Sequence, residues 1–401
     1  MKRLCCATKA LRPSRRRQHR RKTLGVRHTR AFLNELFGED MHAARVKSLA
    51  NAVSGVMMAA LLSIHAIGQA YALLAGIKAK SGVKQIDRLL SNQALDVTAI
   101  QREWVRFVVG VRKQVVVAMD WTEFDGDDQS TLCAYLITNH GRATPLVWRT
   151  VTKSTLAGQR TSVEHDLIER LHGWLDPSID AELLADRGFG DQKLYALLEL
   201  YGWDFHIRFR GNIRVEDAAG EARPAHDWVW PTGRARMLRG AKVTEDRMQV
   251  GAVVVVHARG MKEPWCLVTS RPELTAAQVV KRYGRRFTIE ETFRDTKDLH
   301  FGMGLKATHI GRPDRRDRLL LLVALAHALL TLLGAASEAT GMDAYLKVNT
   351  VKRRTHSLYR QGSYWYQCLP TMRDDWLERL MGAFDRIVRE HAVFREVFGI
   401  L

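Results

Sequence analysis

The sequence feature that most constrains the fold is a short apolar run that follows Lys113. Residues 114–120 read QVVVAMD, with apolar and mostly β-branched side chains at consecutive rather than alternate positions. This pattern is typical of a strand that is buried on both faces of a sheet. The run ends on Asp120, so we expect a carboxylate at the end of a buried strand.

The elements that follow this run come in a definite order. Turn residues separate further apolar runs, and two amphipathic segments lie between them. We expect strands at residues 131–138, 145–151, 181–186 and 203–210, and helices at 162–175 and 191–200. Three strands, a helix, and then strand, helix and strand is the order of a ribonuclease H-like core, so we predict an α/β fold of that class. Asp186 ends the fourth strand as Asp120 ends the first, as that fold requires.

The long apolar segment at residues 319–336 is the one candidate for a membrane span. Its 18 residues lie at the short limit for crossing a bilayer, and His327 falls in the middle. No second span accompanies it. We therefore predict a helix that is buried in a large core.

Charge indicates the class of partner. The chain has 62 Lys and Arg residues against 43 Asp and Glu, which gives a net charge of +19. Such a surplus points to a polyanion, and first of all to nucleic acid. Twelve of the basic residues lie within residues 1–30, which contain no acidic residue, so we expect a disordered basic arm there.

The five cysteines exclude two classes of small fold. They form neither paired Cys-x2-Cys motifs nor a Cys/His spacing typical of zinc sites, which argues against structural zinc and a disulfide framework. The basic N-terminus lacks the apolar core of a secretory signal. We therefore expect a protein of the reducing cytoplasm, which associates with the nucleoid when it is bound to nucleic acid.

The segments outside the core also have recognisable patterns. Residues 31–112 read as helical, with expected interruptions near Gly55 and Gly68, and with Ser81 as the cap of a short helix. Between the core strands and the apolar helix, residues 211–268 are strand-like again. We thus expect a basic arm, a helical domain, an α/β core with an inserted β-region, and a helical C-terminal region, at residues 1–30, 31–112, 113–336 (insertion 211–268) and 337–401.

A second stretch, residues 283–297, reads YGRRFTIEETFRDTK. As one helix, it places one acid, two bases and one tyrosine within about 60° of arc; these are Tyr283, Arg286, Glu290 and Lys297. Phe287 and Phe293 border the same stripe, so the charged face is expected to point inward. Inward charges are costly unless they are paired or used. The chemistry alone leaves a phosphate-handling surface and an internal ion-pair helix equally open.

This spacing, Tyr-x2-Arg-x3-Glu-x6-Lys, resembles the signature of bacterial DDE transposases of the insertion sequence four family. Asp120 in AMDWTEF and Asp186 in ADRGF resemble the first two motifs of that family. The segment IDRLLSNQALD at residues 86–96 resembles the end of its N-terminal domain, which binds transposon ends. The 104 positions from Asp186 to Glu290, which hold the inserted β-region, are also a mark of the family.

The resemblance implies a chemistry for these residues. Asp120, Asp186 and Glu290 would be the catalytic carboxylates and the ligands of Mg²⁺, for which Mn²⁺ substitutes. Two such cations about 3.5–4 Å apart activate a water or 3′-hydroxyl and stabilise the leaving alkoxide, and Mg²⁺ favours hard oxygen ligands. Asp120 would bridge both cations. Tyr283, Arg286 and Lys297 would contact phosphates beside the cleaved bond.

Further candidates for DNA contact have open alternatives. Arg187 and Arg210 each follow or end an expected strand near the site, where either DNA or a surface ion pair would suit them. The resemblance implies that Trp265 stacks on a base turned out of the duplex, although tryptophans at strand starts also pack in cores. The basic and aromatic residues 351–366 suit either a DNA surface or helix packing.

The sequence therefore predicts a transposase that cleaves the ends of its insertion element and joins them to target DNA. Such a reaction couples two double-stranded DNA ends, so we expect a homodimer. A first alternative is a ribonuclease H-like nuclease or resolvase without strand transfer. A second is a catalytically inactive, domesticated DNA-binding protein, which loss of one carboxylate would favour; all three are present.

Overall fold

The computed structural model describes residues 24–389. Most of the predicted basic arm, and residues 390–401 of the predicted C-terminal region, lie outside the described residues. Helix α1 (Val26–Phe37) begins within the stretch that we predicted to be disordered. It is ordered because Phe32, Leu33 and Phe37 are buried in the core.

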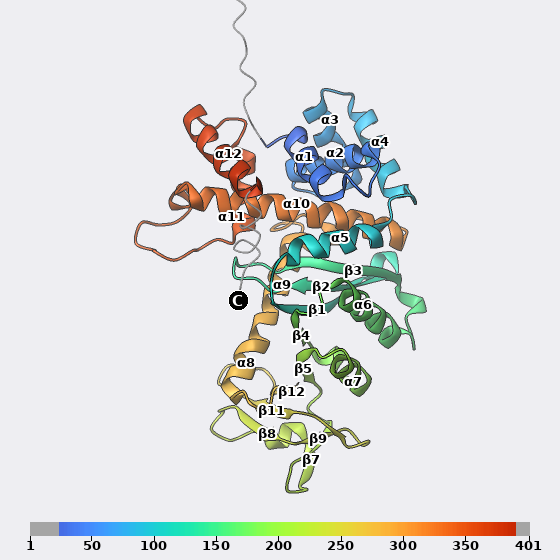
Figure 1. Ribbon diagram of the computed structural model, residues 1–401, viewed down its shortest axis with the longest axis vertical. Helices are drawn as coiled ribbons and strands as arrows, with labels where there is room; N and C mark the ends of the chain where they lie inside the picture. The colour runs from blue at the N-terminus through green and yellow to red at the C-terminus, as the bar shows by residue number, and fades with distance from the viewer. Residues whose placement is uncertain (1–23, 390–401) are drawn as a thin grey trace, which may run out of the picture.

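The N-terminal part is helical and lies at the top of Figure 1. Its helices are α1, α2 (Ala43–Ala59), α3 (Ile64–Ala75), α4 (Ala79–Ser91) and α5 (Val97–Val109). The interruptions predicted near Gly55 and Gly68 are wrong, because each glycine lies inside a helix where another helix passes close to its backbone. The chain breaks at residues 60–63 instead. Ser81 is not a cap either, since α4 begins earlier, with Lys78 at its N-cap.

The central sheet has eight strands within the described residues, in the order β3-β2-β1-β4-β5-β12-β11-β8. The first five strands pair antiparallel from β3 to β1 and parallel from β1 to β5, which is the arrangement of a ribonuclease H-like core. The strands and helices of this part are β1 (Gln114–Phe124), β2 (Gln129–Leu136), β3 (Thr144–Thr152), α6 (Arg160–Trp174), β4 (Asp180–Ala185), α7 (Gln192–Leu200) and β5 (Asp204–Phe209). The predicted order of elements is confirmed.

One strand end differs from the prediction. Strand β1 does not stop at Asp120 but continues to Phe124, because the hairpin with β2 keeps it paired up to Phe124 and Gln129. Its parallel pairing with β4, however, ends at Met119 opposite Ala185. Asp120 thus lies immediately beyond the parallel part of the sheet.

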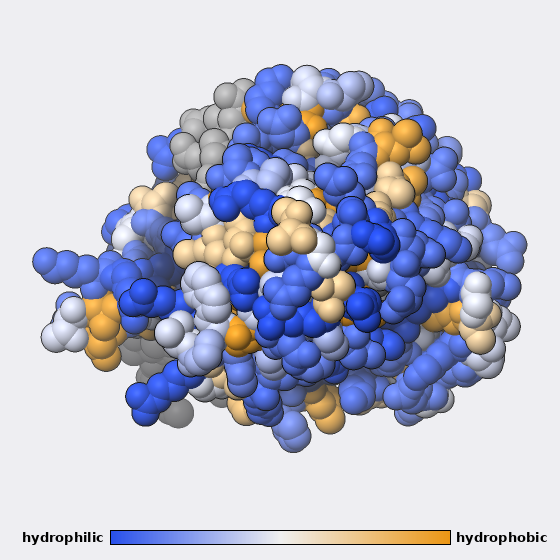
Figure 2. Space-filling model, turned by 90° about the horizontal axis from the view of Figure 1, so that it is seen from below, coloured by the Kyte–Doolittle hydropathy of each residue, from blue (hydrophilic) through white to orange (hydrophobic). Residues whose placement is uncertain are grey.

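The inserted β-region continues the central sheet and adds a small second one. Strand β12 (Trp265–Thr269) pairs with β5, and β11 (Ala252–Val256) and β8 (Arg236–Arg239) extend the sheet further. The second sheet contains β10 (Met248–Gln249), β9 (Lys242–Val243), β6 (Arg214–Glu216) and β7 (Ala222–Pro224). Seen from this end, the molecule is mostly hydrophilic, with small and separate hydrophobic patches (Figure 2).

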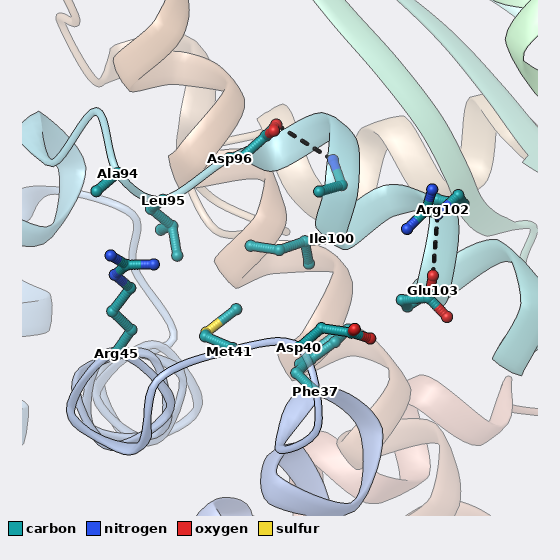
Figure 3. Close-up of a pocket in the computed structure, with 11 residues that line it drawn as sticks. Phe37, Asp40, Met41, Arg45, Ala94, Leu95, Asp96, Ile100, Arg102 and Glu103 are labelled. Carbon is teal, nitrogen blue, oxygen red and sulfur yellow. Dashed lines mark hydrogen bonds and ion pairs between the residues drawn. The ribbon is translucent and has the colours of Figure 1, made fainter.

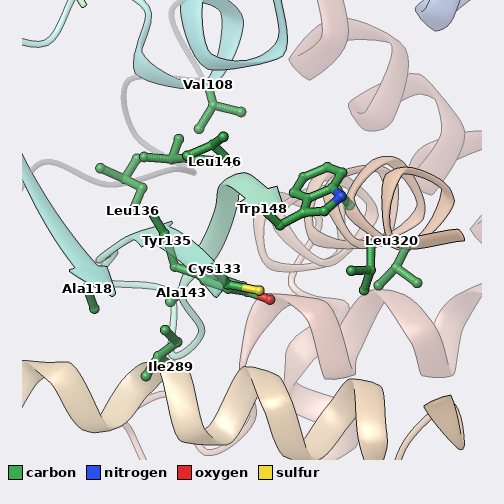
Figure 4. Packing of buried hydrophobic residues seen from close by; sticks show 14 of the residues in the cluster. Val108, Ala118, Cys133, Tyr135, Leu136, Ala143, Leu146, Trp148, Ile289 and Leu320 are labelled. Carbon is green, nitrogen blue, oxygen red and sulfur yellow. The ribbon is translucent and has the colours of Figure 1, made fainter. Parts of the chain in front are cut away.

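The apolar segment forms the middle of α10 (Pro313–Ala339), which crosses the molecule between the N-terminal helices and the sheet (Figure 1). By length and composition it would suffice to cross a membrane, yet 94% of its most apolar window is buried inside the protein. Leu320 at its side packs near Trp148 of β3 in the main core (Figure 4). The prediction of a buried core helix is confirmed.

The C-terminal helices α11 (Leu358–Cys368) and α12 (Asp374–Arg389) pack against α10. Three aromatic side chains of the basic and aromatic segment are buried in this contact, namely Tyr359, Trp365 and Tyr366. Lys352 and Arg353 remain exposed at its start. The aromatic half of the segment therefore serves helix packing, and its basic half stays on the surface.

Candidate active site

Two aspartates meet at the edge where the parallel strands end. Asp120 follows the last parallel residue of β1, and Asp186 follows the last residue of β4, opposite it in the register. Asp186 accepts a hydrogen bond from the backbone N–H of Gly188, and Asp120 accepts one from the N–H of Trp121. These local hydrogen bonds to the backbone hold both carboxylates at this edge.

The stretch that we predicted as one helix consists of three pieces. Helix α8 (Ala276–Gly284) is followed by the 3₁₀ turn η5 (Arg285–Phe287) and by α9 (Thr288–Lys297). The tighter winding of η5 changes the direction of the side chains. Arg286 is buried as a result, whereas Phe287 is 40% exposed, so our prediction that this phenylalanine faces inward is wrong.

The guanidinium of Arg286 lies among three carboxylates from three elements. Its Nη2 is 3.1 Å from Asp120 Oδ2 and 3.6 Å from Asp186 Oδ2. Its Nη1 is 3.0 Å from Glu290 Oε1, one turn further along the chain. The structure thus brings the three predicted carboxylates together around one cation, and of the two alternatives left open for this segment it displays the internal ion pairs.

The electrostatics of this cluster follow from its burial. Burial raises the pKa of Asp120 to about 6, although Arg286 opposes the shift and the nearby Asp186 adds to it. Burial alone would lower the pKa of Arg286, but Asp120 and its other neighbours raise it. The guanidinium is therefore charged, and the cluster keeps a surplus of acidic groups.

An open pocket of about 400 Å³ lies beside the cluster. Asp120 and Glu290 line it together with Lys297, whose Nζ is 4.4 Å from the centre of the Phe293 ring. Lys306 also lines this pocket, and the sequence did not identify it. No motif spacing marks Lys306, because a loop after α9 brings it back to the site.

The chemistry of the donors fits a divalent metal ion. Carboxylate oxygens are the hard ligands that Mg²⁺ and Mn²⁺ prefer, and three of them already converge on one positive charge. Among residues 24–389, no group of three or more acidic, His or Cys side chains is spaced as a ready metal site. Arg286 explains this, since its guanidinium lies between the carboxylates. Asp120, Asp186 and Glu290 would hold the metal once Arg286 has moved aside.

The other predicted DNA contacts lie apart from this pocket. Arg187 pairs with Glu263 at 3.0 Å, and Arg208 pairs with the same carboxylate at 2.7 Å. With Arg210, which is exposed, they line a second pocket of about 550 Å³. The sequence did not identify Arg208 or the acid that holds it.

Trp265 and Tyr283 belong to a small aromatic cluster. Their rings meet edge to face with centroids 5.1 Å apart, and Phe287 lies 5.6 Å from Trp265. Trp265 is partly buried, while Tyr283 is only 2% exposed, and burial raises its pKa to about 12. The buried Tyr283 ring thus packs against the ring of Trp265 and holds it in place.

A separate pocket lies between α1, α2 and α5 (Figure 3). Its volume is about 90 Å³, and both apolar and charged side chains line it. Asp96 caps α5 through the N–H groups of Thr98 and Ala99, and Arg102 pairs with Glu103. This pocket has no feature of a reaction site.

The fold and the carboxylate cluster define a ribonuclease H-like protein with an acidic site at the edge of its sheet. Residues 111–329 match the model of the transposase DDE domain family. This match covers more than half of the chain, and the chain belongs to that family. No curated protein matches it. The protein is thus a DDE transposase of a mobile element, a family that acts on DNA and uses divalent metal ions.

Proposed function

We propose that the protein belongs to the insertion sequence four type, cuts the ends of its element and joins them to target DNA. Three carboxylates from β1, the end of β4 and α9 that converge on one buried cation carry this proposal. The Tyr283, Arg286, Glu290 and Lys297 spacing supports the assignment to this type.

In this proposal Asp120, Asp186 and Glu290 hold divalent metal, with Mg²⁺ as the physiological ion. A bound metal pair supplies activation of the attacking hydroxyl and stabilisation of the leaving oxygen. Lys297 and Lys306 face the pocket and hold the phosphates beside the cleaved bond. Arg286 balances the carboxylates without metal, and turns towards a phosphate when metal and DNA are bound.

The test is cleavage of a labelled duplex taken from the end of the element, with Mg²⁺ or Mn²⁺. Asp120→Asn, Asp186→Asn and Glu290→Gln should each lower the rate by roughly 10³-fold or more while end binding persists. Asp166→Asn serves as a control, since this acid pairs with Arg149 near the surface and does not line the pocket. Near-normal nicking by one of the three variants would remove that residue from the site.

The products of the same assay separate this function from its nearest alternative. A nuclease or resolvase without strand transfer would release cut ends but never join them to a second duplex. An inactive DNA-binding descendant would bind ends and cut nothing. We expect joined products, and a dimer with two ends in the complex that forms them, in the bacterial cytoplasm.

Trp265 is proposed to stack on a base turned out of the DNA end. Its partly exposed ring beside the exposed Phe287 offers a flat aromatic surface, and stacking contributes about 1–3 kcal/mol per base. In this proposal the turned-out base lets a 3′-hydroxyl attack the opposite strand and form a DNA hairpin. On pre-cut ends, Trp265→Ala should lower hairpin formation roughly tenfold, whereas first-strand nicking of uncut ends should survive. Trp230→Ala, at another exposed tryptophan of the inserted region, is the control. Equal loss of both steps with a lower melting temperature would indicate a core residue.

A further inference from the structure

A short loop, residues 298–304, follows α9 and carries two large apolar side chains on the surface. Phe301 is 69% exposed, and Leu299 is 57% exposed. A single exposed apolar residue is ordinary on a protein surface. Here two of them stand within three residues, directly after the helix that holds Glu290, and together they form what we call the apolar ridge.

Hydrogen bonds of the backbone hold this loop in one conformation. Asp298 Oδ1 accepts from the N–H groups of His300 and Phe301, each at 2.7 Å. The carbonyl oxygen of Asp298 accepts from the N–H of Gly304 at 2.9 Å. Gly302 lies so close to α9 that a Cβ atom there would collide with carbonyl oxygens of the last helical turn. The ring of Phe301 is therefore exposed on a fixed backbone, so little ordering of the loop is needed when it binds a partner.

The loop lies between two pockets. Asp298 at its start lines the pocket of the active site, as does Lys306 just after its end. Phe301 lines a different open pocket, of about 700 Å³. Arg294 lines both, so the two pockets adjoin at the C-terminal half of α9. We call the larger one the arginine pocket.

The arginine pocket has a surplus of positive charge. Arg142, Arg294 and Arg360 line it, and Glu291 is the only acid among the described residues that do so. Asp295 is 1% exposed and holds Arg142 and Arg360 from the interior. Three bases thus stand against two acids, one of which is buried. Because lysines line the opposite pocket, basic side chains lie on both sides of the apolar ridge.

This combination fits duplex DNA better than a second copy of the protein. A second copy would bring the same basic surface against this one, and juxtaposed like charges oppose such a contact. Duplex DNA offers phosphates to both pockets and stacked bases between its phosphate backbones. Proteins that kink DNA insert apolar side chains, phenylalanine and leucine among them, between base steps and thereby bend the duplex.

The position of the ridge selects the target duplex rather than the element's end. Phe287 and Trp265 lie at the N-terminal end of α9, where the proposed function places a base of the element's end. The apolar ridge follows the C-terminal end of this helix, which has ten residues and is therefore about 15 Å long. Joining requires two duplexes at one site, so the ridge is left for the second of them.

We propose that Phe301, with Leu299 two residues before it, inserts between two base pairs of the target duplex and bends it at the active site. Lys306 and the arginine pocket hold phosphates on the two sides of the inserted ring. The bend brings a target phosphate towards the carboxylates for the joining step. This inference rests on the proposed function, because it supplies the site for the target that joining requires.

The test is the joining of pre-cut element ends to an intact target duplex, with the full chain and Mg²⁺. Phe301→Ala should lower the joining rate roughly tenfold, because the target must then bend without the inserted ring. Phe301→Leu keeps an apolar wedge and should retain most of the rate. Cleavage of uncut ends by Phe301→Ala should stay within about twofold of the unaltered protein, since that step needs no target. The control is Leu200→Ala, at an apolar side chain that is 78% exposed and lines neither pocket.

Targets with one mismatched base pair separate a wedge from a simple contact. A mismatch lowers the cost of unstacking, so at one position near the joint it should bring the joining rate of Phe301→Ala to within about threefold of the unaltered protein. The positions of the mismatch are therefore tested in turn. A defect of the same size on intact and on all mismatched targets would show that Phe301 does not open the duplex, and would overturn the inference.

The remaining outcomes separate this inference from the proposed function. Normal joining by Phe301→Ala, or an equal loss in Leu200→Ala, overturns the inference alone. Equal loss of cleavage and joining would place the ring of Phe301 on the element's end and would overturn it as well. If the unaltered protein cuts ends but joins them to no target, intact or mismatched, the proposed function fails instead.

Discussion

Helix α9 takes part in two charged clusters that differ in their balance. At its N-terminal end, Glu290 and two aspartates surround Arg286 beside an open pocket. On its other side, Asp295 is 1% exposed and is held by Arg142 and by Arg360, the latter at 2.6 Å. The first cluster has three acids for one base, and the second has two bases for one buried acid.

This difference separates structure from function on a single helix. The Asp295 cluster is complete within the chain and ties α9 to the loop before β3 and to α11. The Arg286 cluster brings three acids to one base and opens to solvent, so in the proposed function it is the cluster that receives metal cations. The presence of a buried ion pair does not by itself distinguish these two roles, because both clusters contain one.

The largest expected effect concerns the complete cluster. Asp295→Ala removes the buried acid that holds Arg142 and Arg360, and should lower the free energy of unfolding by about 3–5 kcal/mol. Glu290→Gln should change it by less than about 1 kcal/mol, because the Glu290 side chain is 53% exposed. Urea unfolding of both variants in EDTA compares them. Equal losses would contradict the division into a structural and a functional cluster.

A pH dependence should mark the incomplete cluster. Burial raises the pKa of Asp120 to about 6 in the folded protein, above its usual value of 3.8. The folded state therefore binds this proton more tightly than the unfolded state does. The resulting stabilisation is complete below about pH 4 and is lost as the pH rises through about 6, by about 3 kcal/mol.

Asp120→Asn removes this titration and leaves the other acids in place. In EDTA, the free energy of unfolding of Asp120→Asn minus that of the unaltered protein should therefore increase from about pH 4 to about pH 7. Glu164, whose pKa is also raised to about 6 by burial, contributes equally to both proteins and cancels. A difference that stays constant with pH would show that burial in this cluster does not raise the pKa of Asp120.

Much of this arrangement was predictable from local patterns. Residues 114–120 and 181–186 read as buried strands that end on acids, and the ends of neighbouring parallel strands must meet at one edge. The convergence of Asp120 and Asp186 follows from that rule. The spacing from Arg286 to Glu290, one helical turn, brings the third acid to the same cation.

The remaining features depend on contacts between segments far apart in the sequence. The exposure of Phe287 results from the 3₁₀ turn, which no spacing rule predicts. Asp295 looks like any surface acid of α9, because its partners Arg142 and Arg360 come from a loop and from another helix. Lys306 reaches the pocket only through the path of the loop after α9.

The smallest effect concerns the cation at the centre of the incomplete cluster. The guanidinium of Arg286 lies within 3.0–3.6 Å of all three carboxylates, so it competes with metal for the same oxygens. Arg286→Gln removes the competing charge and should tighten Mn²⁺ binding roughly tenfold in the absence of DNA, which corresponds to about 1.4 kcal/mol. Calorimetric titration with Mn²⁺ measures this directly. The control is Arg294→Gln, at an arginine of the following helix α9 that is paired with Glu291.

Stability offers a second readout for Arg286, independent of catalysis. In EDTA, Arg286→Gln leaves three neighbouring carboxylates without their cation and should melt at a lower temperature than the unaltered protein. Saturating Mn²⁺ should restore more of this loss than Mn²⁺ adds to the unaltered protein, because ligand binding stabilises in proportion to affinity. Weaker Mn²⁺ binding by Arg286→Gln would instead mean that the arginine positions the carboxylates for the metal. The geometry of both clusters on α9 would then depend on their arginines.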